Sequence, residues 1–169
     1  MTQRSARMLP RAMVLAAVFS HLVACGGSTE AVIDVGSMPE GGTFNGVFQS
    51  AQYGEMHLCE TGAQVVGRYE KDERRGTVQG TVQGDVLRFA WEESRELVGG
   101  RPRVTSGRGY FRLVAGRDGS FGLKGEWGYG TNLTGGGPWE AIKLRRRQPE
   151  DCPGADAGGD AAASADVGG

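Results

Sequence analysis

Apolar and polar residues alternate with a period of two through most of the chain between residues 43 and 144. Leu87, Phe89 and Trp91, for example, are separated by single arginine and alanine residues. Because successive side chains of a β-strand point to opposite faces, this pattern predicts strands with one buried face. Eight strands are predicted, at 43–49, 55–60, 64–70, 76–83, 86–92, 109–115, 120–127 and 139–144.

The connections between these predicted strands contain turn residues such as Gly62, Gly84 and the pair Asp118-Gly119, which are typical of hairpins. Residues 93–108 and 128–138 are predicted as two longer loops. Short hairpins make sequential strands antiparallel neighbours, so the predicted fold class is all-β: an eight-stranded antiparallel up-and-down meander that closes into a small barrel. Glycines on the predicted inward face allow the close packing that closure requires, at Gly46, Gly67, Gly80, Gly109 and Gly125. The alternative is a curled open sheet or a two-layer sandwich.

The regions on either side of the predicted barrel have different compositions. Three arginines precede an uncharged apolar run at 12–23, an order that predicts a secretory signal peptide at 1–24 with a signal helix. The run is too short to cross a bilayer, which needs about 20 apolar residues; the alternative is a short buried core helix. Residues 25–42 are predicted as a flexible linker, 43–149 as the barrel domain, and the acidic Ala/Gly-rich residues 150–169 as a disordered tail.

Composition and charge restrict the function. Glycine makes up 30 of the 169 residues, which disfavours long helices, and the formal net charge of −1 disfavours binding to nucleic acid through phosphate contacts. Two histidines and three cysteines offer few metal-ligand or nucleophile–base sets, so we predict no metal, no cofactor and no catalytic residue. Glu92 and Glu126 follow the outward face of their strands, which disfavours a hydrolase with paired carboxylates.

The apolar run ends in Leu22-Val23-Ala24-Cys25, which resembles the lipobox of bacterial lipoproteins. The resemblance implies that Cys25 becomes the acylated, palmitate-bearing first residue of the mature protein. It also implies that these acyl chains anchor the protein to a membrane of the bacterial cell envelope, at the outer membrane or cell surface rather than the inner membrane. The alternative is cleavage after Ala24 without lipidation.

Lipidation of Cys25 would leave Cys59 and Cys152 as a pair. An exported protein lies in an oxidising compartment, so we expect a disulfide between Cys59 and Cys152. The alternative is two unpaired thiols. His57 lies two residues from Cys59 and alternates with Met56 and Leu58, so it is predicted to be an exposed residue on the outward face.

Segments such as Gly42-Thr43-Phe44-Asn45-Gly46 and Val86-Leu87-Arg88-Phe89-Ala90-Trp91 resemble the glycine-rich small-barrel domains of bacterial lipoproteins. A more distant similarity is to the calycin barrels, the lipocalins and avidins, with Phe44 where those families typically have tryptophan. The similarity to calycins implies a barrel that carries a small hydrophobic ligand.

Four residues are candidates for ligand binding at the barrel mouth: Trp91, Trp127, Tyr129 and Asn132. Aromatic side chains with a few polar groups suit a small apolar ligand, and the glycine-rich loop at 128–137 carries two of the four. The alternative for the aromatic residues is a place in the core. The basic run at 145–147 could contact anionic lipid, or it could be a solvated strand end.

These features favour a non-catalytic, lipid-anchored envelope protein, monomeric, whose barrel serves as a binding or structural module for a small apolar ligand or an envelope partner. The first alternative is a carrier with its ligand inside the barrel, which would need a connected apolar cavity of roughly 300 Å³ or more. The second alternative is an envelope hydrolase.

Overall fold

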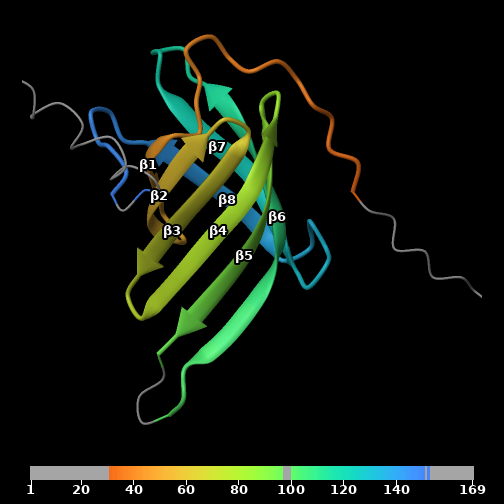
Figure 1. Ribbon diagram of the computed structural model, residues 1–169, viewed down its shortest axis with the longest axis vertical. Helices are drawn as coiled ribbons and strands as arrows, with labels where there is room; N and C mark the ends of the chain where they lie inside the picture. Colours follow the sequence, from red (N-terminus) through yellow and green to blue (C-terminus); the bar gives the residue numbers. More distant parts are fainter. Residues whose placement is uncertain (1–30, 97–99, 151, 153–169) are drawn as a thin grey trace, which may run out of the picture.

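The computed structural model describes residues 31–96, 100–150 and 152, and its strands form a closed antiparallel barrel in sequence order (Figure 1). The strands are β1 (Gly46–Ser50), β2 (Gly54–Thr61), β3 (Gln64–Lys71), β4 (Arg74–Gln83), β5 (Val86–Arg95), β6 (Arg103–Ala115), β7 (Phe121–Tyr129) and β8 (Gly137–Lys143). Strand β8 closes the barrel by pairing with β1, with Phe48 opposite Lys143. The predicted all-β meander barrel is confirmed, and the open sheet and the sandwich are excluded.

The predicted signal helix at 1–24 and Cys25 lie outside the described residues, as does the disordered tail predicted at 150–169 except for Glu150 and Cys152. Within the described ranges, there is no helix that could span a membrane.

The prediction of a long loop at 93–108 is wrong. Strand β5 continues to Arg95 and β6 begins at Arg103, so the two strands extend as a hairpin beyond their neighbours, at the lower end of the barrel in Figure 1. The sequence did not indicate this extension because the hairpin leaves the core there, and residues such as Arg95 and Arg103 replace the apolar half of the alternation.

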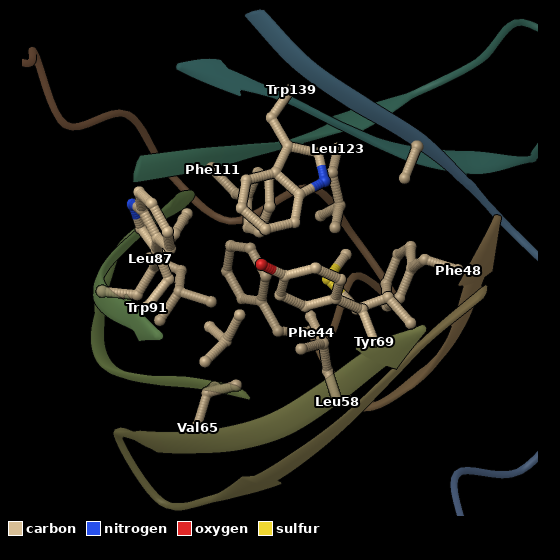
Figure 2. Packing of buried hydrophobic residues seen from close by; sticks show 14 of the residues in the cluster. Phe44, Phe48, Leu58, Val65, Tyr69, Leu87, Trp91, Phe111, Leu123 and Trp139 are labelled. Carbon is tan, nitrogen blue, oxygen red and sulfur yellow. The ribbon is translucent and has the colours of Figure 1, made fainter. Parts of the chain in front are cut away.

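The barrel interior is filled by side chains from alternate positions of every strand (Figure 2). Alternation predicts one inward face for Leu87, Phe89, Trp91, Phe111, Leu113, Phe121, Leu123 and Trp127. The structure confirms it: Phe121 and Trp127 are half-buried against the core cluster, and the other six are buried. Inward glycines let strands approach one another closely. A Cβ atom at Gly125 would lie only 1.8 Å from the carbonyl oxygen of Tyr110 on β6.

One end of the barrel, formed by the turns after β2, β4 and β6, is closed by the chain that precedes β1. The carboxylate of Asp85, in the β4–β5 turn, accepts a hydrogen bond from the backbone N–H of Gly36 at 2.7 Å and pairs with Arg112. Arg88 donates to the carbonyl oxygen of Ile33 at 2.9 Å. Residues 33–42 therefore lie against the barrel, whereas the sequence predicted a flexible linker over 25–42. Their attachment depends on side chains about 50 residues later, which local composition does not reveal.

A second carboxylate, that of Glu60, holds the end of the chain before β1 beside the core. Glu60 accepts hydrogen bonds from the hydroxyl of Thr43 at 2.5 Å and from the N–H of Phe44 at 2.9 Å. Phe44 is fully buried and plugs this end of the barrel. Lys143 donates to the carbonyl oxygen of Thr43 at 3.0 Å, and burial lowers its pKa although the charge of Glu60 opposes that shift.

After β8 the chain returns across the outside of β1 and β2. Cys152 forms the predicted disulfide with Cys59, with the two Cα atoms 5.5 Å apart. The backbone N–H of Glu150 donates to Nδ1 of His57 at 3.0 Å, so His57 is only 7% exposed. His57 does face outward, as alternation predicted, but its predicted exposure is wrong because the returning chain covers it.

The contacts of His57 also fix its tautomer. Since Nδ1 accepts a hydrogen bond, the proton of the neutral ring lies on Nε2, which is 2.9 Å from Oε1 of Glu55. That hydrogen bond is the main reason that the pKa of Glu55 is lowered, and the nearby Arg147 acts in the same direction. The returning chain is thus held by polar contacts as well as by the disulfide.

Candidate ligand-binding mouth

The other end of the barrel, formed by the turns after β1 and β3, the extended β5–β6 hairpin and the loop at 130–136, holds a cavity of about 290 Å³. Six of the residues that line it are aromatic: Tyr53, Tyr69, Trp91, Trp127, Tyr129 and Trp139. The other five are polar or charged: Arg74, Glu93, Arg95, Arg103 and Thr105. The mouth therefore combines aromatic walls with a charged rim.

Three aromatic rings on β5 and β7 contact one another edge to face. The ring of Trp127 lies 5.3 Å from that of Trp91 and 4.9 Å from that of Tyr129, and both pairs are nearly perpendicular. The indole N–H of Trp91 donates to the carbonyl oxygen of Arg108 at 3.2 Å, which fixes its orientation. Edge-to-face pairs of this kind are favourable beyond the area that they bury. The three rings form one wall of the cavity, and Tyr129 remains 59% exposed.

The floor of the cavity is Trp139, which projects from β8 into the interior and is 1% exposed (Figure 2). Its ring centroid lies 4.3 Å from Tyr53 and 5.0 Å from Tyr69 on the mouth side. On the other side it contacts Phe89 at 5.7 Å and Phe111 at 5.2 Å. The space below Trp139 is thus occupied by core side chains, so the cavity is a shallow bowl at the mouth.

Glu93 is the one carboxylate among the described residues that line the cavity. Its Oε2 accepts a hydrogen bond from the hydroxyl of Tyr69 at 3.2 Å, and its Oε1 lies 4.0 Å from Nε of Arg74. Burial raises the pKa of Tyr69 well above its ordinary value, and the charge and the hydrogen bond of Glu93 raise it further. Burial likewise raises the pKa of Tyr53. Both tyrosines are therefore neutral hydrogen-bonding groups near pH 7.

Of the four predicted binding residues, Trp91, Trp127 and Tyr129 line the cavity and Asn132 does not. Asn132 is exposed in the loop after β7, where its backbone N–H donates to the carbonyl oxygen of Tyr129 at 3.2 Å. The sequence placed it near the mouth through its loop but gave no information on the direction in which that loop folds.

Sequence reasoning missed Tyr53, Tyr69 and the charged residues of the mouth, and its four candidates did not include Trp139, one of the aromatic residues that the strand pattern offered. Had the strand predicted at 86–92 been extended, its alternation would have placed Glu93 and Arg95 on the same inward face as Trp91. Tyr53 lies in the turn between β1 and β2 and gave no periodic signal.

Chemically, the mouth can stack against a flat group and pair with charge. Of the residues that the structure describes, no three His, Cys, Asp or Glu side chains are grouped so that they could hold a metal ion. Comparisons with protein-family models, with curated proteins and with solved structures found no match.

Proposed function

We propose that the protein is a lipid-anchored, non-catalytic binding protein of the bacterial envelope, which acts as a monomer and holds a small planar ligand in the mouth of its barrel. The observation that supports ligand binding is the aromatic bowl itself. A cavity of about 290 Å³ is near the lower end of the sizes common for small-molecule sites, and aromatic walls with a few polar groups are usual in such sites.

A ligand at the mouth fits the packing better than a ligand inside the barrel. Trp139, Phe89 and Phe111 are buried and in mutual contact below the bowl. A deep apolar ligand would have to displace this packed core, which is energetically costly. A planar group that packs against Trp127 in the bowl would bury apolar area without displacing the core side chains.

The bowl also lacks the arrangement that a hydrolase with two carboxylates needs. Glu93 is hydrogen-bonded to Tyr69 and paired with Arg74, and no second carboxylate of the described residues lines the cavity. Glu92 is exposed on the outer face of β5. This arrangement favours binding over glycoside cleavage, in which two carboxyl groups flank the scissile bond.

Binding is tested by isothermal titration calorimetry of the full chain with two naphthalene probes, naphthalene-2-carboxamide and naphthalene-2-carboxylate. We expect saturable 1:1 binding of at least one probe, weakened about tenfold by Trp127→Ala because stacking and the buried area of one ring are lost. Ile142→Ala is the matched control, since Ile142 is 65% exposed and is not among the residues that line the cavity. Absence of saturable binding by both probes at millimolar concentration would refute the proposed site.

The anchor is tested separately by Cys25→Ser in the bacterial cell from which the gene derives. The proposed acylation rests on the Leu22–Cys25 pattern. We expect the wild-type chain in the membrane fraction with the mass of an acylated, cleaved protein, and the variant uncleaved or released. An identical fraction and mass for both would contradict lipidation.

A further inference from the structure

Three arginines form a row across neighbouring strands at the mouth. In the register of the sheet, Arg74 on β4 is opposite Arg95 on β5, and Arg95 is in turn opposite Arg103 on β6. All three line the cavity. Like charges directly opposite on adjacent strands repel each other and destabilise a sheet, so such a row calls for a compensating anion.

The charges on the chain compensate this row only in part. Glu93 lies 4.0 Å from Nε of Arg74, but its other oxygen is engaged by Tyr69. Among the described residues, Arg95 and Arg103 have no ion-pair partner. The rim of the cavity thus carries three guanidinium groups and one carboxylate, and this excess of positive charge lines the same cavity as Trp91, Trp127 and Tyr129.

A ligand that compensates this row must carry negative charge, which a purely hydrocarbon ligand does not.

We infer that the mouth selects small planar anions, of the class of aromatic or heteroaromatic carboxylates. The ring packs against Trp127 and Tyr129, and the carboxylate lies at Arg95 and Arg103, whose guanidinium groups present the paired donors that a carboxylate accepts. This inference rests on the proposed function and specifies the charge of its ligand.

The test compares the two naphthalene probes, which differ in charge and are almost identical in shape. We expect the carboxylate to bind at least tenfold more tightly than the carboxamide at low salt, and the ratio to fall toward one in 0.5 M NaCl because salt screens exposed charges. Arg95→Gln and Arg103→Gln should each weaken carboxylate binding much more than carboxamide binding and so remove most of this preference. Arg108→Gln, an exposed arginine on the outer face of β6, is the matched control.

A folding readout separates loss of the site from loss of structure. In the absence of ligand, Arg95→Gln should unfold at the same urea concentration as the wild type or a higher one, because it relieves the repulsion within the row. Equal binding of the two probes would overturn the inference and leave the proposed function intact, whereas failure of both probes to bind would overturn both. A preference for the carboxylate that survives the Arg95→Gln/Arg103→Gln double variant would also overturn the inference, since the anion would then bind elsewhere.

Discussion

The inner faces of β3 and β4 offer a sharp test of the packing that builds the mouth. Tyr69 and Gly76 are directly opposite each other in the register of these strands. A Cβ atom at Gly76 would lie 2.1 Å from Cζ, 2.4 Å from Cε1 and 2.4 Å from the hydroxyl oxygen of Tyr69. The ring of Tyr69 therefore occupies the space that a side chain at position 76 would need, and Gly76→Ala must displace it from Trp139 and Glu93.

Two opposing effects set the magnitude for Gly76→Ala. Overpacking of a filled core costs about 1–3 kcal/mol, whereas alanine in a strand interior is about 0.5–1 kcal/mol better than glycine. We expect a net loss of about 1–2 kcal/mol in the wild-type background. In a Tyr69→Ala background, which itself costs about 3–5 kcal/mol, the same substitution should stabilise the protein by about 0.5–1 kcal/mol. The coupling energy of the two substitutions is then about 2 kcal/mol, well above the error of additivity for independent sites.

The assay is urea unfolding of the oxidised full chain, followed by tryptophan fluorescence, for the wild type, both single variants and the double variant. Thr77→Ala is the control, because Thr77 is exposed on the opposite face of β4 and its loss should change stability by less than about 0.5 kcal/mol. Equal destabilisation by Gly76→Ala in both backgrounds would refute the reasoning, since the cost would then arise from the backbone of β4 and not from the ring.

Three further predictions concern the disulfide, the buried tyrosine and the core. Replacing Cys59 and Cys152 by alanine opens a loop of 93 residues and should cost about 4–5 kcal/mol in the chain-entropy model, measured by the same urea unfolding. Because the pKa of Tyr69 is raised, its contribution to stability is fully present below about pH 10 and lost as the pH rises further, so Tyr69→Phe should flatten the alkaline decline in stability; an unchanged decline would contradict this. Phe89→Ala should cost about 3–5 kcal/mol, because the ring is 3% exposed and lies 4.6 Å from that of Phe111; a cost below about 1 kcal/mol would show that the core does not depend on it.

The sequence alone determined the number and order of the strands and the direction of their side chains, though not the full length of β5 and β6. The alternation of Leu87, Phe89 and Trp91 is a local property, because a strand that buries one face needs an apolar side chain at every second position. Turn residues between the runs then made antiparallel neighbours of sequential strands. The barrel and the inward aromatic set could therefore be predicted, and the pairing of Cys59 with Cys152 followed from counting cysteines in a chain that is predicted to be exported.

The tertiary structure decided what lies at the ends of the barrel and on its outer surface. Attachment of residues 33–42 depends on Asp85 and Arg88, and burial of His57 depends on Glu150, which is 93 positions later in the chain. No local pattern encodes contacts between such distant residues, since the chain segments before β1 and after β8 are mostly polar and lack periodicity.

The sequence determined one part of the candidate site and the tertiary structure determined the rest. Alternation and the glycine-rich loop indicated Trp91, Trp127 and Tyr129, but the same reasoning included Asn132, which the fold leaves outside the cavity. The row of Arg74, Arg95 and Arg103 exists only because the strand register aligns residues from three strands at one level. Register is fixed by the pairing of whole strands, so a charge cluster across a sheet becomes visible only when the strands are assembled.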